Sequence, residues 1–333
     1  MLILFIALLT FFLIEIIYFK IANHFNIIDH PNERSSHSTI TLRGGGIIFP
    51  IAFCLAVAIW QPVYSYIAFG VFAIATISFA DDVLTLNNKL RIGVHLLAVS
   101  LLLFNIHQAF LAPYSSFLIP LVFLIPLAYI FIIGIINAYN FMDGINGITV
   151  LYSFVTVLSI WVAQNTLKVN LLHENVWHLL LASLMVFGFF NFRKKAKTFA
   201  GDVGSISMAI IISFLIALLM IQTQEFKWIL LLAVYGLDTV ATICCRVVRK
   251  ENIFKAHRSH FYQYLANEKK WSHLLISTLY AVLQLSINVL LIYFSDSLAA
   301  LLFFLLLIIF YISIRLILEG RDRLFKNYNV LVL

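Results

Sequence analysis

Long uninterrupted apolar runs follow one another along this 333-residue chain. A helix of about 20 apolar residues crosses the roughly 30 Å hydrocarbon core of a bilayer, and it satisfies its own backbone hydrogen bonds there. The composition agrees, because 62% of the residues are hydrophobic and only 11% are charged, which is too little charge for a soluble surface. A transmembrane β-barrel would need short segments of alternating polarity. The sequence therefore predicts an all-α integral membrane protein.

Eleven runs qualify as candidate transmembrane helices, and together they predict a polytopic helical bundle. They cover residues 2–22, 46–60, 63–80, 91–106, 117–136, 147–164, 176–192, 203–222, 227–246, 273–293 and 298–317. The second and third are short, and Gln61-Pro62 separates them. Because no low-complexity linker or soluble domain interrupts the series, we expect residues 1–333 to form a single membrane domain.

Lys and Arg are distributed unequally between the two sides of these segments. With eleven spans, 20 of the 22 Lys and Arg residues fall on one side, and only Lys168 and Lys227 fall on the other. Positive residues accumulate in cytoplasmic loops, so the N-terminus is predicted outside and the C-terminus inside. The net charge of +7 then reflects this topology and attraction to anionic head groups of the lipid bilayer. It requires no nucleic-acid partner.

The unusual polar stretches all fall on the predicted cytoplasmic side. They occupy the loops 29–47, 81–91, 137–147, 191–205 and 246–270. The loops on the other side carry fewer polar residues. The three cysteines show no CxxC spacing, so we expect neither a disulfide framework nor a zinc site. A single site assembled from the five loops is the simplest interpretation.

Four carboxylates mark this side, namely Asp81, Asp82, Asp143 and Asp202. Ionisable groups at the membrane edge are costly and commonly functional, and converging carboxylates repel one another unless a cation lies among them. Mg²⁺ suits such oxygen ligands, because it also accepts waters and the oxygens of substrate phosphates. The pattern therefore predicts a magnesium site at which a phosphate compound reacts.

Basic and histidine side chains in the same loops suit a phosphate or a diphosphate. They are Lys89, Arg91, Arg193, Lys194, Lys197, His257, Arg258 and His260. The turns at Gly44–Gly46 and at Gly201 permit close backbone approach. The second turn also opens a helix, whose N-terminus favours anions.

Each feature by itself has a simpler structural explanation. Asp81 and Asp82 could cap a helix and balance neighbouring cations, and Asp202 could be an ordinary N-cap. Asp143 with its asparagines could belong to a solvated loop. The stretch with the two histidines could be an amphipathic helix at the membrane surface. All of them together on one side of one domain favour a functional site.

Two further acids lie inside predicted spans. Asp238 should have a partner, because a lone carboxylate at membrane depth is costly. Glu15 has no evident partner in the sequence, and it could face lipid or a contact between copies of the chain.

Taken in order, five motifs resemble the polyprenyl-phosphate N-acetylhexosamine-1-phosphate transferase family. They are DHPNERSSHSTITLRGGG, FADDVLTLNNKLR, NAYNFMDGINGI, FAGDVGS and KAHRSHFYQ, over about residues 29–264. The last motif is most similar to the subgroup that initiates bacterial surface polysaccharides such as O-antigen. The resemblance implies a fold of ten or eleven transmembrane helices in the bacterial inner membrane, with an active site that faces the cytoplasm.

The resemblance also implies a reaction. An N-acetylhexosamine-1-phosphate would pass from a UDP-N-acetyl sugar, by default UDP-GlcNAc, to undecaprenyl phosphate, and UMP would leave. Mg²⁺, or Mn²⁺ in its place, is implied as the cofactor, and a homodimer is suggested. The alternatives from other classes are a transporter or flippase of lipid-linked precursors and a catalytically silent scaffold. Neither would release UMP.

Roles for individual residues follow from the same resemblance. Asp81 is the candidate that deprotonates or orients the lipid phosphate, and Asp82 would hold the charge network. Asp202 would bind the metal, with Asp143 as a second carboxylate near metal and nucleotide. His257 and His260 belong to a histidine loop expected at the diphosphate or the sugar. Substrate contacts are implied for Arg43, Lys89, Asn137, Asn140, Asn146, Gly201 and Arg258.

The chain also departs from the family pattern. Asn146 stands where several members carry an aspartate, and Thr85 stands where some carry an acid. The histidine motif lacks the consecutive histidines of some relatives. Metal binding is therefore expected to depend mainly on Asp202 and Asp143, and the sugar contacts stay open.

Overall fold

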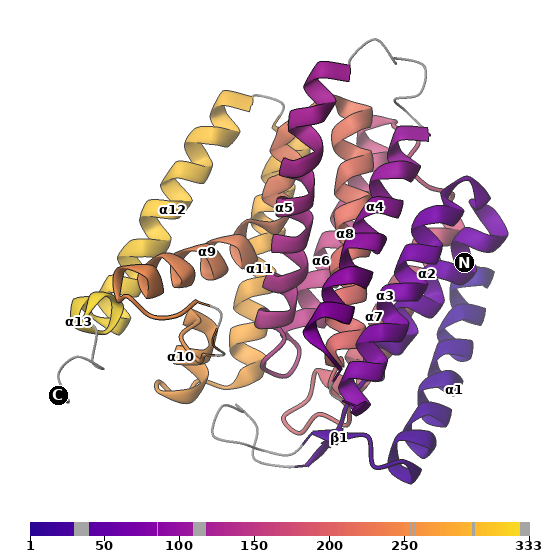
Figure 1. Ribbon diagram of the computed structural model, residues 1–333, viewed down its shortest axis with the longest axis horizontal. Helices are drawn as coiled ribbons and strands as arrows, with labels where there is room; N and C mark the ends of the chain where they lie inside the picture. Colours follow the sequence, from indigo (N-terminus) through magenta and orange to yellow (C-terminus); the bar gives the residue numbers. More distant parts are fainter. Residues whose placement is uncertain are drawn as a thin grey trace.

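The computed structural model describes residues 1–29, 40–84, 86–108, 118–253, 255, 257–294 and 297–326, which form a bundle of helices (Figure 1). The longer helices are α1 (Leu2–His24), α2 (Ile48–Trp60), α3 (Ser65–Leu84), α4 (Asn88–Ile106), α5 (Leu118–Met142), α6 (Ile148–Leu167), α7 (Glu174–Asn191), α8 (Gly201–Thr223), α9 (Ala233–Val248), α11 (His273–Tyr293) and α12 (Ser297–Glu319). The shorter elements are strands β1 (Ile28–Asp29) and β2 (Thr41–Leu42), the 3-10 helices η1 (Gly45–Ile47), η2 (Pro62–Tyr64) and η5 (Phe226–Leu232), and helices α10 (Phe261–Asn267) and α13 (Arg321–Phe325). Thr85, residues 30–39 of the first predicted loop, and residues 254 and 256 of the fifth lie outside the described part.

The eleven apolar runs predicted from the sequence each coincide with one helix or with two in direct succession. Among the described residues, nine helical segments are long and apolar enough to cross a membrane. Of the two remaining runs, Gly45–Trp60 is a shorter apolar helix and α7 is not among the nine. The protein is therefore an all-α, polytopic membrane protein, as predicted. The number of crossings and their direction stay predictions.

The ninth predicted span is not one straight helix. It is divided into η5 and α9, and Figure 1 shows α9 running across the direction of α5 and α11. A break of this kind leaves backbone groups in need of new partners, and membrane depth makes that costly. The buried Gln284 of α11 supplies two, because its amide nitrogen donates to the carbonyl of Leu230 (2.9 Å) and its Oε1 accepts from the N–H of Val234 (3.0 Å). A polar side chain inside an apolar helix thus stabilises the change of direction.

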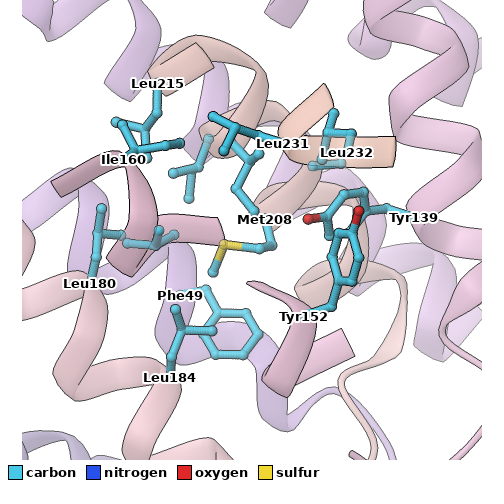
Figure 2. Close-up of a cluster of buried hydrophobic side chains, with 14 of the residues drawn as sticks. Phe49, Tyr139, Tyr152, Ile160, Leu180, Leu184, Met208, Leu215, Leu231 and Leu232 are labelled. Atoms are coloured by element: carbon cyan, nitrogen blue, oxygen red, sulfur yellow. The ribbon is translucent and has the colours of Figure 1, made fainter. Parts of the chain in front are cut away.

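Helix α8 forms the centre of the bundle. In the apolar stretch of α8, 83% of the residues are buried, whereas only 17% are buried in the apolar stretches of α5 and α12. Figure 2 shows Met208 of α8 among side chains of α2, α6 and α7, including Phe49, Tyr152 and Leu184. Tight packing around α8 leaves its backbone little freedom to move. Its first residue, Gly201, is therefore a fixed point on which a site can be built.

The loops that the sequence assigns to one side of the membrane also meet in space. Strand β1 pairs antiparallel with β2, with Ile28 opposite Leu42 and Asp29 opposite Thr41. Figure 1 shows β1 and α10 at the same end of the bundle. The start of α8 lies there too, since Leu42 of β2 forms a parallel bridge with Thr198, three residues before that helix.

Candidate active site

The first and fourth predicted loops form one backbone scaffold. The N–H groups of Gly45 and Gly46 donate to the carbonyls of Phe199 (2.9 Å) and Ala200 (3.1 Å). The contact is close, because a Cβ on Gly46 would lie 2.4 Å from the Cα of Gly204. A side chain at Gly46 would therefore push apart the two loops on which the site stands.

Asp82, at the end of α3, caps the start of α8. Its carboxylate accepts the backbone N–H groups of Asp202 (3.0 Å) and Val203 (3.2 Å), two of the donors that a helix leaves unpaired at its first turn. Gly201 has a φ of +71°, and a Cβ there would lie 2.5 Å from Oδ2 of Asp82. The glycine that opens α8 is therefore required both by its backbone conformation and by the carboxylate against it. Asp82 acts as a cap from 120 residues away in the chain.

Two arginines bridge the aspartates. Arg43 Nη2 lies 2.8 Å from Asp82 Oδ1 and 3.2 Å from Asp202 Oδ1. Arg91 Nη1 lies 2.7 Å from Asp81 Oδ2, and its Nη2 lies 3.4 Å from Asp202 Oδ2. Asp202 thus makes the two longest contacts, and its side chain is 18% exposed whereas that of Asp82 is fully buried. Among Asp81, Asp82 and Asp202, Asp202 is therefore the carboxylate held most loosely by its arginine partners.

This arrangement changes the electrostatic argument made from the sequence. In the sequence, the expected repulsion between the carboxylates indicated a metal ion. In the structure, two guanidinium groups already lie among Asp81, Asp82 and Asp202. Within the described residues no group of three or more His, Cys, Asp or Glu side chains is placed to hold a metal ion. Any ion at this site would need ligands from water and substrate as well as from the protein.

Asp143, in the turn after α5, is the other carboxylate that could bind a cation. Its Oδ1 accepts a hydrogen bond from Thr149 Oγ1 at 2.5 Å. Burial raises the pKa of Asp143 to about 6, and the negative charge of Asp202 contributes to the rise. The two carboxylates therefore repel each other electrostatically. Hard oxygen donors that repel each other are the kind of ligands that a Mg²⁺ ion accepts beside waters and phosphate oxygens.

The histidine loop lies against the Asp143 turn. The Tyr262 hydroxyl donates to the carbonyl of Phe141 (2.7 Å), and a Cβ on Gly144 would lie 2.2 Å from that hydroxyl. The rings of His257 and His260 stack with centroids 5.0 Å apart, and each lies 6.0 Å from the ring of Phe141. The structure thus brings the fifth predicted loop onto the third.

The two histidines differ in their surroundings. His257 is half-buried, and its Nδ1 lies 3.0 Å from Ser259 Oγ. Burial is the main cause that lowers the pKa of His257 to about 4, with smaller contributions from His260 and Arg246 included in that value, so His257 is neutral at pH 7. His260 is 2% exposed, and its Nδ1 lies 3.3 Å from Asp238 Oδ1. The expectation that Asp238 has a partner is confirmed.

The other predicted substrate contacts are spread around this centre. Lys89 is exposed in the first turn of α4, and its backbone N–H bonds to the Asn87 side chain (2.9 Å). Asn137 is exposed and Asn140 half-buried, one turn apart near the end of α5. Arg258 is half-buried beside His257. None of these positions by itself assigns a ligand.

Asn146 is placed as a support. It is 5% exposed, and its amide nitrogen donates to the carbonyl of Arg193 at 2.8 Å. Its Oδ1 has no hydrogen-bond partner among the described residues. The contact ties the Asp143 turn to the loop before α8. A direct contact of Asn146 with substrate stays a prediction.

Helix α1 contributes supports that the sequence analysis missed. The Tyr18 hydroxyl donates to the carbonyl of Arg43, which fixes the backbone of the bridging arginine. Glu15 was expected to face lipid or another copy of the chain, and that expectation is wrong. Glu15 is fully buried, and its Oε1 lies 2.6 Å from the place of a Cβ on Gly45. Glu15 and Tyr18, three residues apart, lie on the same face of α1, and both are buried in the structure.

Asn191 is another missed support. Its Oδ1 accepts from the N–H of Gly147 and its amide nitrogen donates to the carbonyl of Thr198, both at 2.8 Å. One side chain therefore joins the end of the Asp143 turn to the loop that precedes α8. Its position at the start of the fourth polar loop is visible in the sequence, but its partners are not.

Known proteins with similar sequences are transferases. Residues 64–224, from η2 to the end of α8, match the glycosyl transferase family 4 model. The chain is 29% identical over 272 residues to a probable undecaprenyl-phosphate N-acetylglucosaminyl 1-phosphate transferase of Bacillus subtilis (strain 168), which covers 78% of this chain and 75% of that protein.

Two phospho-N-acetylmuramoyl-pentapeptide-transferases are also similar. The one from Orientia tsutsugamushi (strain Ikeda) is 27% identical over 241 residues, covering 60% of this chain and 66% of that protein. The one from Streptococcus mutans serotype c is 31% identical over 193 residues, covering 53% of this chain and 54% of that protein. The ordered motifs, the helical membrane fold and these matches all support the polyprenyl-phosphate N-acetylhexosamine-1-phosphate transferase family.

Proposed function

We propose that this protein transfers N-acetylglucosamine-1-phosphate from UDP-GlcNAc to undecaprenyl phosphate at the cytoplasmic face of a bacterial inner membrane. The observation that carries the proposal is the arginine-bridged acid cluster, formed by Arg43, Arg91, Asp81, Asp82 and Asp202 at the start of α8. Guanidinium groups bind phosphate oxygens, and this cluster places two of them at the end of a membrane bundle. A lipid phosphate and a nucleotide diphosphate can meet there.

In the proposed reaction, an oxygen of the lipid phosphate attacks the β-phosphorus of the nucleotide sugar. A bond forms between that oxygen and the β-phosphorus, the bond from the β-phosphorus to the bridging oxygen breaks, and the electron pair leaves with UMP. Such a transfer depends on alignment and on neutralisation of charge. Arg43 and Arg91 suit the second task, because their contacts with Asp202 are long and can be exchanged for phosphate oxygens.

The surroundings of Asp81 and Asp82 favour positioning roles. Asp82 is occupied by two backbone N–H groups and by Arg43. Asp81 pairs with Arg91, and its Oδ1 accepts the N–H of Leu86 at 2.6 Å. A phosphate monoester is already largely ionised near pH 7 and needs no strong base. We therefore assign Asp81 to orienting the lipid phosphate through Arg91.

Asp202 and Asp143 would hold a Mg²⁺ ion, or Mn²⁺ in its place. When bound, such an ion would neutralise charge on the diphosphate and on the leaving UMP. The chain's own contribution is to keep Asp202 only loosely paired and to hold Asp143 in a buried turn through Thr149. His257 and His260 would lie towards the diphosphate or the sugar. The HRSHFYQ motif supports a role in the first membrane step of O-antigen or another surface polysaccharide.

The proposal can be tested on detergent-solubilised protein with undecaprenyl phosphate, Mg²⁺ and a panel of UDP-N-acetyl sugars. The readouts are UMP release and the mass of the lipid product. We expect UMP and a diphosphate-linked lipid with UDP-GlcNAc, and neither product when Mg²⁺ is removed by chelation. A transporter or a scaffold would give no UMP with any sugar of the panel, and that result would refute the proposed function.

A further inference from the structure

A second acid network lies around Asp238 in α9, outside the acid cluster. The Asp238 carboxylate is fully buried and accepts the backbone N–H groups of Phe261 (3.0 Å) and Tyr262 (3.2 Å). Its oxygens also accept the hydroxyl groups of Tyr280 (2.6 Å) and Thr242 (3.3 Å). A buried carboxylate is tolerated only when donors of this kind surround it. Asp238 thus fixes the start of α10 from a neighbouring helix.

Arg315 of α12 fixes the same region from the other side. Its side chain is 4% exposed and donates to Thr242 Oγ1 (3.0 Å) and to the carbonyl of Ser259 (3.2 Å). Arg315 also pairs with Glu319 one turn later in α12. The residue just before His260 is therefore held through its backbone, while Asp238 holds the residues just after it.

His260 joins this network through only one of its two ring nitrogens. Its Nδ1 faces the Asp238 carboxylate at 3.3 Å. A carboxylate accepts and does not donate, so Nδ1 carries the proton of this contact. The other ring nitrogen, Nε2, is buried and has no hydrogen-bond partner among the described residues. Buried polar atoms are rarely left unpaired in native proteins, so an orphan at this position needs an explanation.

The position of the His260 ring provides an explanation for this unpaired nitrogen. His260 lies against Phe141, two residues before Asp143, and the half-buried His257 stacks on it from nearer the surface. We propose that Asp238 is a positioning residue of the transferase, which holds His260 by Nδ1–H so that Nε2 can take up a proton from solvent and donate it in a hydrogen bond to an oxygen of the substrate's diphosphate. This inference rests on the proposed function. It adds a role for Asp238, which lies outside the acid cluster.

A purely structural role for Asp238, as the cap of α10, makes a different prediction. A cap stabilises the fold whatever residue occupies position 260. A positioning residue loses its effect once His260 is gone. The two roles therefore separate in a double-mutant cycle.

The cycle compares Asp238→Asn, His260→Gln and the double variant by UMP release in the detergent assay. We expect each single change to lower kcat by about 10- to 100-fold, the range typical for partners that orient a working side chain. The double variant should be no more than about threefold slower than the slower single variant. Losses that multiply in the double variant would overturn the inference. An inactive wild-type protein would instead remove the proposed function.

A milder pair of variants covers the case in which Asp238→Asn does not fold. Tyr280→Phe removes one donor to Asp238 and keeps the carboxylate. Tyr264→Phe is the matched control, because it removes a hydroxyl that donates to the carbonyl of Leu318 and does not touch Asp238. Tyr280→Phe should lower kcat several-fold and leave KM nearly unchanged, whereas Tyr264→Phe should change neither. Equal effects of the two substitutions would contradict the inference.

The state of the ring can be read without turnover. In protein labelled with ¹⁵N-histidine, the His260 signals are assigned by their loss in His260→Gln, with His24→Gln as an exposed control. We expect the proton on Nδ1 in the unliganded protein and a change at Nε2 when UDP is added with Mg²⁺. A neutral ring with its proton on Nε2, or no response of Nε2 to UDP, would overturn the inference.

Discussion

The two acid networks of this protein contain the same residue types but differ in how fully their carboxylates are paired. In the acid cluster at the start of α8, three aspartates share two arginines, and the contacts of Asp202 are long and partly exposed to solvent. Around Asp238, one carboxylate receives five donors and is fully buried. The charged groups of the acid cluster can therefore also bind a ligand, whereas the carboxylate of Asp238 is fully occupied by its donors.

The difference teaches which acids can do chemistry. A carboxylate saturated with donors cannot exchange partners without leaving buried groups unpaired, so it holds structure in place. A carboxylate with long contacts to arginine can yield those arginines to phosphate oxygens at little cost. Asp82 and Asp238 belong to the first class, and Asp202 belongs to the second. The predictions below test that division, beginning with the largest effect.

Replacement of the loosely paired carboxylate should abolish transfer. Asp202→Asn keeps the shape and can keep the contact to Arg43, but it removes the charge. We expect kcat to fall by at least about 1,000-fold in the UMP assay, because charge neutralisation at the diphosphate is lost. Thermal unfolding should shift little.

The matched control is Asp322→Asn, an exposed carboxylate paired with Lys326 at 2.8 Å. It should leave both turnover and unfolding unchanged. Near-normal turnover of Asp202→Asn would show that this acid is not the working one.

The glycine that opens α8 should be nearly as sensitive, but through geometry. In Gly201→Ala the new Cβ meets Asp82 Oδ2 at 2.5 Å on a backbone with φ +71°. The carboxylate has to move away and release two N–H groups of α8, which should cost about 1–3 kcal/mol of stability and about 100-fold in kcat. Gly236→Ala is the control, because nothing lies within 4 Å of its Cβ position. Equal melting temperatures of the two variants would show that Asp82 does not depend on this glycine.

Most helix ends could be predicted from the sequence to within four residues, because apolar runs long enough to span a bilayer fold as helices whatever their neighbours are. The exception is α5, which runs to Met142 and so includes Asn137 and Asn140, although both were predicted in a loop. The direction of α9 could not be predicted. It depends on Gln284, which lies 50 residues further along the chain than Val234, to which it bonds. A local apolar pattern carries no record of such a partner.

The candidate site was predictable in its members and less so in their roles. Asp81, Asp82, Asp143 and Asp202 stood out, because acids are rare in a membrane chain. Arg43 and Arg91 were predicted as substrate or phosphate contacts but not as partners of these acids, because Arg43 lies 39 residues from Asp82 and Arg91 lies 10 residues from Asp81. The sequence therefore called for a metal where arginine supplies part of the positive charge. Glu15 and Tyr18 were missed because an apolar helix does not show which of its faces packs inward.

The pH dependence of turnover should report the state of Asp143. With a pKa raised to about 6, this acid is ionised above that pH and protonated below it. If the carboxylate is the required form, kcat/KM should fall as the pH drops through about 6, by about tenfold at pH 5. His257, with a pKa of about 4, stays neutral over this range and should not contribute.

Thr149 gives a way to shift the acid limb, which is the fall in kcat/KM at low pH. Its hydroxyl bonds to Asp143 Oδ1 and lowers the pKa of the acid. Thr149→Val should therefore shift the acid limb to higher pH, and Thr149→Ser should leave it in place. Because a bound divalent ion favours the carboxylate, more Mg²⁺ should shift the limb to lower pH. A limb that responds to neither change belongs to another group.

The smallest effect is expected where the acid cluster is supported from α1. Tyr18→Phe removes the hydroxyl that donates to the carbonyl of Arg43 and leaves the ring against Phe79, with centroids 6.3 Å apart. One lost hydrogen bond costs about 1 kcal/mol, so kcat should fall by no more than about fivefold. Because the guanidinium itself is retained, KM for the nucleotide sugar should change less than kcat. Tyr66→Phe, whose exposed ring packs on Phe104, is the control and should have no effect. A loss for Tyr18→Phe as large as that for Gly201→Ala would mean that α1 takes part in the acid cluster itself, and the division between working and supporting residues would have to be redrawn to include it.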